Sequence, residues 1–80
     1  MTIQVKLFAV MAQRAGVREV GLELPNNSSA SAVRAAVLQK FPDLSWPAGT
    51  MLAVNQEYAG PETALRDGDE VAIIPPVSGG

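Results

Sequence analysis

The sequence has 80 residues, of which 48% are hydrophobic and 18% are charged, and its formal net charge is −2. This length fits one domain, and this balance is that of a folded chain rather than a disordered one. The chain has no cysteine and no histidine, which removes disulfides, cysteine nucleophiles, the usual metal ligands and the commonest general base.

The charges and the N-terminus exclude further classes of protein. The six basic residues are scattered and form no basic patch that could bind the phosphates of a nucleic acid, so we expect no nucleic-acid partner. The first residues lack a charged leader followed by an apolar core, so they do not read as a signal peptide. No apolar run approaches the roughly 20 residues of a membrane span. We therefore expect a cytoplasmic protein with no membrane partner.

Two strands are predicted in the first quarter of the chain. Apolar and other residues alternate over residues 3–10 and again over residues 19–24, which is typical of strands with one buried face. Pro25 ends the second strand. The two strands are predicted to pair as an antiparallel hairpin, and the connection over residues 11–18 is too long for a two-residue turn.

One helix is predicted, over residues 30–41. Val33, Val37 and Phe41 are spaced four apart and form an apolar stripe, and Pro42 ends the helix. The polar turn over residues 26–29 is predicted to supply side-chain caps for its first N–H groups. This is the only helix that the sequence predicts.

The second half of the chain reads as short strands and turns. Residues 51–54 and 71–74 are predicted strands, and Tyr58 begins a short return between them. Trp46 lies in the loop over residues 43–50, and we interpret it as a packing residue rather than a binding platform. Gly68 is predicted to take positive φ in a tight turn.

Acidic residues crowd this half of the chain. Two interpretations stay open, a solvated loop region and an acidic face that meets a basic partner; the residues are Glu57, Glu62, Asp67, Asp69 and Glu70. Three of them surround Gly68, but an oxygen cage for a cation needs more ligands at fixed spacing. We therefore expect turn chemistry there and no metal site.

These elements predict an α+β domain over residues 1–74, with a mixed sheet and one main helix packed on one face. We expect the first and last strands to be parallel neighbours. In the first strand Ile3, Val5 and Leu7 face the core, so Phe8 faces away. By the same phase Ile74 faces away, near the start of the tail, and Tyr58 at a strand end joins them as a candidate partner interface.

Residues 75–80 are predicted to form a flexible tail. The rigid Pro75-Pro76 ends the last strand, and Val77, Ser78, Gly79 and Gly80 follow. Glycine has no Cβ, so a diglycine backbone can pass through a channel too narrow for side chains. These features alone do not distinguish a functional tail from a tail without a function.

A resemblance to a known family covers nearly the full length. The matching residues are 6–9 in the first strand, 52–56 at the third strand and 65–80, in which an Asp-Gly-Asp-Glu-Val turn precedes Pro-Pro-Val-Ser-Gly-Gly. On these residues the chain resembles the small subunit of molybdopterin synthase, a ubiquitin-like β-grasp sulfur carrier. The chain departs from the family in one place: Ala12-Gln13-Arg14 stands where such subunits often carry an Arg-Glu pair, so contacts of that pair do not carry over.

The resemblance implies a function and partners. A partner adenylyltransferase would use MgATP to adenylate the carboxylate of Gly80, and a sulfur donor protein would convert it to a thiocarboxylate. The large subunit of molybdopterin synthase, in a heterotetramer, would pass this sulfur to cyclic pyranopterin monophosphate during molybdenum cofactor biosynthesis. The chain itself would bind no cofactor tightly and would be no enzyme on its own. The same resemblance implies that Phe8, Tyr58 and Ile74 dock on the partners.

Three alternatives remain at this point. A carrier for another sulfur pathway, such as thiazole synthesis, would share Gly79-Gly80. A ubiquitin-like protein modifier would be joined to lysines through Gly80. A plain β-grasp binding domain would leave the tail idle.

Overall fold

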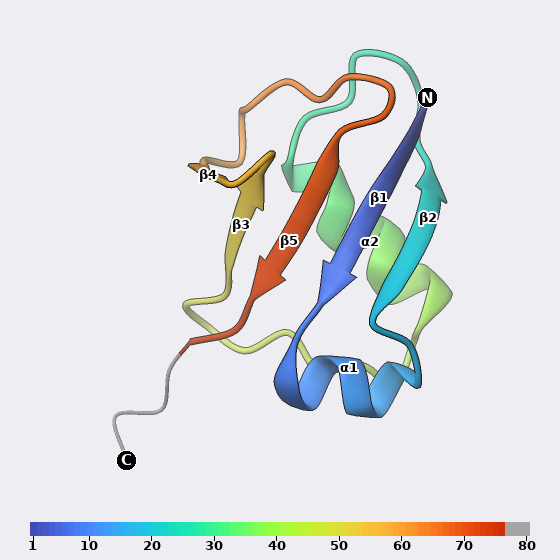
Figure 1. Ribbon diagram of the computed structural model, residues 1–80, viewed down its shortest axis with the longest axis vertical. Helices are drawn as coiled ribbons and strands as arrows, with labels where there is room; N and C mark the ends of the chain where they lie inside the picture. Colours follow the sequence, from blue (N-terminus) through green and yellow to red (C-terminus); the bar gives the residue numbers. More distant parts are fainter. Residues whose placement is uncertain (77–80) are drawn as a thin grey trace.

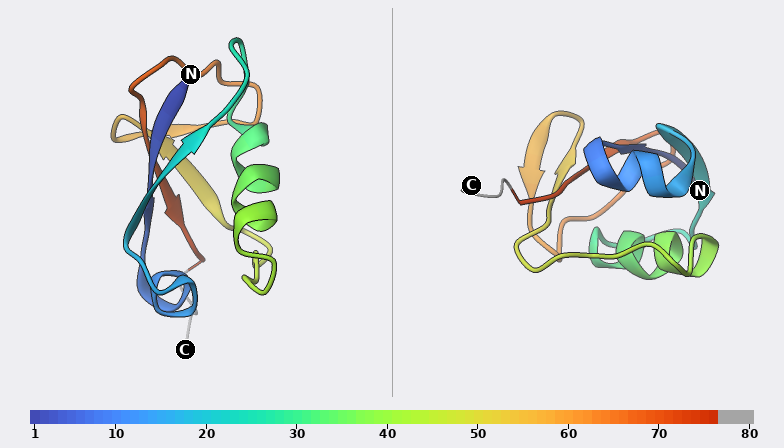
Figure 2. Two further views of the ribbon diagram at one scale, coloured as in Figure 1. Left: turned by 90° about the vertical axis from the view of Figure 1, so that its right-hand side faces the viewer. Right: turned by 90° about the horizontal axis from the view of Figure 1, so that it is seen from below.

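The computed structural model describes residues 1–76. Its elements in chain order are β1 (Thr2–Leu7), α1 (Ala9–Ala15), β2 (Glu19–Glu23), α2 (Ser31–Lys40), β3 (Met51–Val54), β4 (Glu57–Ala59) and β5 (Glu70–Ile74). The five strands form one mixed sheet in the order β2-β1-β5-β3-β4. Helix α2 crosses one face of this sheet, and α1 closes one end of it (Figure 1; Figure 2).

The two middle strands of the sheet are β1 and β5, and they run parallel, as the sequence predicts. Every other pair is antiparallel. The largest fully buried side chains line the inner face of β1 and β5 and the facing side of α2; they are Ile3, Val5, Val33, Val37, Val71 and Ile73. Burying each such side chain contributes about 1.5–3 kcal/mol, so this layer supplies a large share of the driving force for folding. The layout is the β-grasp arrangement that the sequence predicts.

The sequence-based prediction of a single helix is wrong, because α1 is formed by residues 9 and 10, predicted as the end of the first strand, and by residues 11–15, predicted as part of the connection. Ala9 has φ +52°, and this left-handed residue stops β1. Met11 is buried, and Ala12 and Ala15 pack beside it, which is a helical spacing over only two turns. Gly16 ends the helix with φ +78° and donates its N–H to the carbonyl oxygen of Ala12 at 2.9 Å.

The predicted side-chain caps of α2 are also not formed. Its cap residue is Ala30, and no side chain accepts from the first turn. Instead, Ala30 N–H donates to the carbonyl of Thr63 at 2.8 Å and Ser31 N–H to that of Pro61 at 3.0 Å. The backbone of the segment before β5 therefore binds the cap residue and the first helical residue, while the N–H groups of Ala32 and Val33, which a side-chain cap would bind, donate to the carbonyls of Ser29 and Ala30 at 3.0 Å each.

The loop between α2 and β3 packs against the core. Leu44 is buried, and Trp46 is half-buried against the hydrophobic cluster, as expected for a packing residue. No helix among residues 1–76 is long and apolar enough to cross a membrane.

The turn before β5 is tied to the start of β1. Gly68 has φ +86°, as predicted, and its N–H donates to the carbonyl of Thr2 at 2.8 Å. The carboxylate of Asp67 accepts from the N–H of Thr2 at 2.7 Å. These two hydrogen bonds fix the start of β1 beside the turn that leads into β5, and so set the register of the two strands.

Asn55 connects this turn to the β3–β4 hairpin. Asn55 and Gln56 both have positive φ, as a two-residue type I′ turn requires. The Asn55 side chain donates to the carboxylate of Asp69 and accepts from the N–H of Glu70, each at 3.0 Å. The carboxylates of Asp67 and Asp69 thus hold the turn together, and the carboxylate of Glu70 lies 3.1 Å from the ammonium of Lys6.

Gly68 gives the first testable prediction. Gly68→Ala should lower the free energy of unfolding by about 1–2 kcal/mol, because an L side chain is strained at this φ. No atom lies within 4 Å of the added Cβ, so crowding does not contribute. Gly60→Ala is the matched control: its Cβ also meets open space and its φ is not positive. Urea unfolding should show no loss for the control, and equal losses in both variants would contradict the strain.

Asp69 gives a prediction for the dependence of stability on pH. The N–H of Arg66, at 2.7 Å, and the Asn55 side chain hold the pKa of Asp69 below its ordinary value of 3.8. A carboxyl whose folded pKa is depressed stabilises the fold above its unfolded pKa, and this contribution is lost as the pH falls through the folded pKa. Asp69→Asn should therefore flatten the acid limb of stability below about pH 4. Parallel acid limbs for wild type and variant, in urea melts at stepped pH, would contradict this role.

Candidate functional site

The predicted tail begins directly after β5. Pro75 and Pro76 are the last described residues, and Val77, Ser78, Gly79 and Gly80 lie outside the described residues. Pro75 lines a groove with side chains of α1 and of the loop before β3, namely Val10, Met11, Arg14, Leu44, Ser45 and Pro47. Gly49, at φ +86°, lies next to Pro76: a Cβ added at Gly49 would lie 3.5 Å from the Cβ of Pro76, which is ordinary van der Waals contact. We call Pro75 and Pro76 the tail root.

The outer face of the sheet is the face that α2 leaves uncovered (Figure 2). Strand pairing shows which residues share it. Met51 pairs with Ile74 across β3 and β5, and Ala53 pairs with Ala72 on one side and Tyr58 on the other. Leu52 and Val54, which alternate with them, pack against the core. Met51, Tyr58 and Ile74 therefore lie on one face.

Phe8 joins this face at the end of β1. The last parallel pair is Leu7 with Ile73, and Leu7 is buried while Phe8 is 46% exposed. Phe8 is also the residue that precedes α1, and its carbonyl accepts from the N–H of Met11 at 3.1 Å. A strand on one side and a helix on the other thus fix the backbone that presents the ring.

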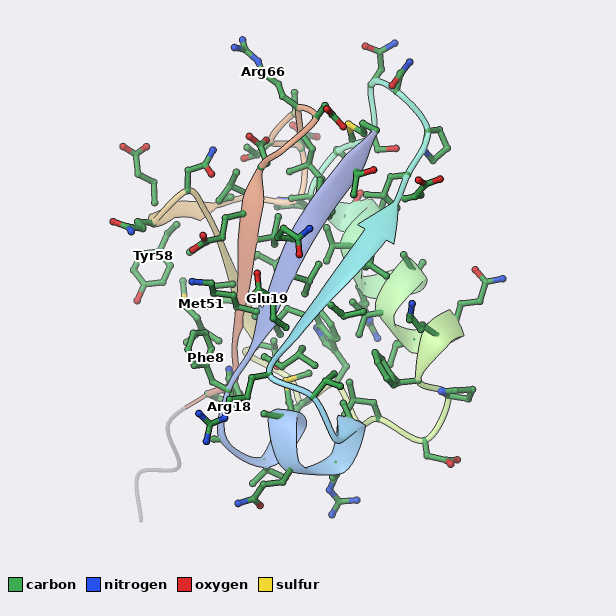
Figure 3. All side chains as sticks on the ribbon, turned by 45° about the vertical axis from the view of Figure 1, so that its right-hand side comes forward. Phe8, Arg18, Glu19, Met51, Tyr58 and Arg66 are labelled. Carbon is green, nitrogen blue, oxygen red and sulfur yellow. The ribbon has the colours of Figure 1, made fainter. Side chains whose placement is uncertain are left out.

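These side chains form an apolar surface, which we call the outer-face patch: Phe8, Met51, Tyr58 and Ile74. Figure 3 shows Tyr58, Met51 and Phe8 following one another along one side of the molecule. Tyr58 is 70% exposed and Met51 49%, while Ile74 is half-buried. The patch ends at the tail root, because Ile74 directly precedes Pro75.

The structure places Phe8, Tyr58 and Ile74 on one face, as predicted, with Phe8 and Tyr58 exposed and Ile74 half-buried; their role as a partner interface stays a prediction. Sequence reasoning missed Met51, although its alternation with Leu52 and Val54 carries the signal. That alternation becomes readable only when β3 is known to pair with β5, because only then does the inward face of β5 assign the inward face of β3.

One ion pair lies on the same face. The ammonium of Lys6 is 3.1 Å from the carboxylate of Glu70, and both side chains are about 40% exposed. Lys6 also sits opposite Glu19 in the β1–β2 register. Water screens this pair, so its contribution to stability is small, at most about 1 kcal/mol.

Among residues 1–76 no three acidic side chains gather as a metal site, and no polar side chain is buried. A surface of exposed aromatic and aliphatic side chains beside a chain end is suited to contact with another protein.

Known proteins share this sequence and fold. Residues 5–80 match the model of the ThiS family. The molybdopterin synthase sulfur carrier subunit of Chlamydomonas reinhardtii is 43% identical over 83 aligned residues, which cover 100% of both chains. The small archaeal modifier protein 1 of Haloferax volcanii superimposes with a TM-score of 0.87 at 29% identity, over 100% of both chains.

A third similarity is to a structure of two proteins together. A chain in the complex of subunits 1 and 2 of molybdopterin-converting factor from Helicobacter pylori superimposes with a TM-score of 0.70 at 26% identity, again over 100% of both chains. The family match, the full-length relative and the shared sheet topology lead to one assignment: the chain belongs to the ThiS family and has the ubiquitin-like β-grasp fold.

Proposed function

We propose that this chain is the sulfur-carrier subunit of a molybdopterin synthase and that Gly80 carries the sulfur. The observation that carries the proposal is the similarity to the Chlamydomonas carrier subunit, which covers this whole chain up to its diglycine. The outer-face patch supports the proposal, since this exposed apolar surface ends where the tail begins and could bind a partner that takes up the tail.

The chemistry starts from an unreactive group. A C-terminal carboxylate has a pKa of about 3.5 and is fully ionised at neutral pH, so it resists nucleophiles. An oxygen of Gly80 attacks the α-phosphorus of ATP on the adenylyltransferase, which forms an acyl-adenylate and releases pyrophosphate. A sulfide equivalent from the sulfur donor protein then forms a C–S bond as the bond to AMP breaks. The product is the Gly80 thiocarboxylate.

Delivery returns the carrier to its starting state. The tail enters the large subunit, and the thiocarboxylate sulfur forms a C–S bond to a side-chain carbon of cyclic pyranopterin monophosphate as a C–O bond at that carbon breaks and its oxygen leaves. Water then hydrolyses the resulting thioester, which leaves sulfur on the pterin side chain and a free carboxylate on Gly80. In this scheme the catalytic groups and MgATP belong to the partners, which accords with a sequence that has no histidine and no cysteine. The chain would act in the cytoplasm, in a heterotetramer with the large subunit.

A second candidate function is protein modification. The similarity to small archaeal modifier protein 1, with a TM-score of 0.87, favours it specifically. Both functions begin with adenylation of Gly80, but they differ in the acceptor: a lysine amine in the modifier and a sulfur acceptor in the carrier. A thiazole-pathway carrier would share the thiocarboxylate and differ only in the final acceptor.

The decisive experiment measures the intact mass of the chain after incubation with the adenylyltransferase, MgATP and a sulfur donor. We expect the mass increase of one oxygen replaced by sulfur, confined to the last residue by fragmentation. Deleting Gly80, or adding one residue after it, should abolish the increase while the melting temperature stays unchanged. Sulfur on either variant would contradict the role of Gly80. Transfer to cyclic pyranopterin monophosphate in the presence of the large subunit separates this carrier from the thiazole carrier and the modifier.

Phe8 tests the docking surface. Phe8→Ala should weaken binding to the large subunit by about tenfold or more, because aromatic anchors dominate interfaces. Val17→Ala is the control, since Val17 is also an exposed apolar side chain but lies outside the outer-face patch. Calorimetric titration should show near-wild-type affinity for the control, and both variants should keep the wild-type melting temperature. Unchanged affinity for Phe8→Ala would remove the patch from the interface.

A further inference from the structure

The charges of the chain are divided between its two ends. Strands β1 and β5 both point toward the end that holds α1 and the tail root, which we call the tail end (Figure 1). The Lys6–Glu70 ion pair lies between the two ends and is left out of the count. The opposite end then holds five acidic side chains against one basic one; they are Glu23, Glu57, Glu62, Asp67, Asp69 and Arg66. The tail end holds three basic side chains against two acidic ones, namely Arg14, Arg18 and Lys40 against Glu19 and Asp43. A chain of net charge −2 therefore presents its tail from a basic end.

Two arginines flank the tail root on different sides. Arg14, in the last turn of α1, lines the same groove as Pro75. Arg18 lines a second groove, together with Phe8 of the outer-face patch. Figure 3 shows Arg18 beside Phe8 at the end of β1. A partner that covers the patch and takes up the tail must approach both guanidinium groups.

Neither arginine has an acidic partner among residues 1–76. Lys6 lines the groove of Arg18 as well, but Glu70 binds its ammonium at 3.1 Å and Glu19 stands opposite it in the sheet. Lys6 is thus already compensated, while Arg14 and Arg18 have no compensating carboxylate within the described residues. Covering an arginine without an anion costs desolvation energy, and its planar group suits carboxylates in particular.

We infer that the protein that receives the tail presents a rim of carboxylates around the tail opening, and that Arg14 and Arg18 recognise it. This inference rests on the proposed function, because it assumes that a partner takes up the tail. Charges at the edge of an apolar contact mainly accelerate association and reject wrong partners. The outer-face patch would supply affinity, and the two arginines would supply speed and orientation.

The test measures association rates by stopped flow with the large subunit and, separately, with the adenylyltransferase. The double variant Arg14→Glu/Arg18→Glu should associate about tenfold more slowly than wild type at about 50 mM salt. This gap should close at about 500 mM salt, where exposed charges are screened. Arg34→Glu is the matched control, since this exposed arginine lies on α2, on the other layer of the molecule, and should change the rate less than twofold.

A second variant separates charge from structure. Arg14→Lys/Arg18→Lys keeps both charges and should retain most of the wild-type rate and its salt dependence, while melting temperatures show that all variants are folded. Equal rates for the glutamate double variant and for Arg34→Glu would overturn the inference, and faster association of the double variant would show that the partner's rim is basic. A loss seen only with the adenylyltransferase and only with ATP bound would assign the arginines to nucleotide phosphates instead. If the wild-type chain binds neither protein, the proposed function falls as well; if it binds both and the charge reversal is silent, only this inference falls.

Discussion

The parallel pairing of β1 with β5 is the contact on which the rest of the structure depends. It joins the two ends of the chain, and it puts four of the six largest fully buried side chains, Ile3, Val5, Val71 and Ile73, into one layer. Parallel neighbours cannot be joined by a tight turn, so the intervening chain has to cross over, and α2 covers the layer as it does so. The same pairing aligns the ends of both strands. Phe8 and the tail root therefore emerge together at one end of the sheet.

The register of this pairing decides which face meets a partner. A slip of one residue would turn Ile74 into the core and bring Val71 and Ile73 to the outside. Three groups oppose such a slip at the far end of the strands: Gly68 and Asp67, which both bind Thr2, and Asn55, which bridges Asp69 and Glu70. The turn before β5 thus controls the outer-face patch from the opposite end of the molecule. A functional effect of a substitution there would arise from register and not from contact with a partner.

The sequence was sufficient to predict most of the sheet and part of the site. Strict alternation fixed the inward faces of β1 and β5, and with them the exposure of Phe8 and Ile74. It failed at residues 9–15, because a period of two continues by chance through Ala9 and Val10, while a helix of two turns leaves little helical periodicity. The capping prediction failed for another reason. The carbonyls that bind the start of α2 come from Pro61 and Thr63, about thirty residues along the chain, and local patterns cannot show such a contact. Met51 was missed for the same reason, since its face depends on pairing with β5.

The two edge strands bear on how the chain behaves while it is alone. An exposed edge offers unpaired N–H and C=O groups to any other strand. An apolar outer face beside that edge would further stabilise the association of two copies. Here one edge is β4, only three residues long, and the other is β2, which carries Glu19 and Glu23 on either side of Gly21. A second copy that added itself to β2 would bring like charges together, and β4 is too short to template a ladder. The protein can therefore expose the apolar outer-face patch while no partner is bound, without its copies pairing edge to edge into a continuous sheet.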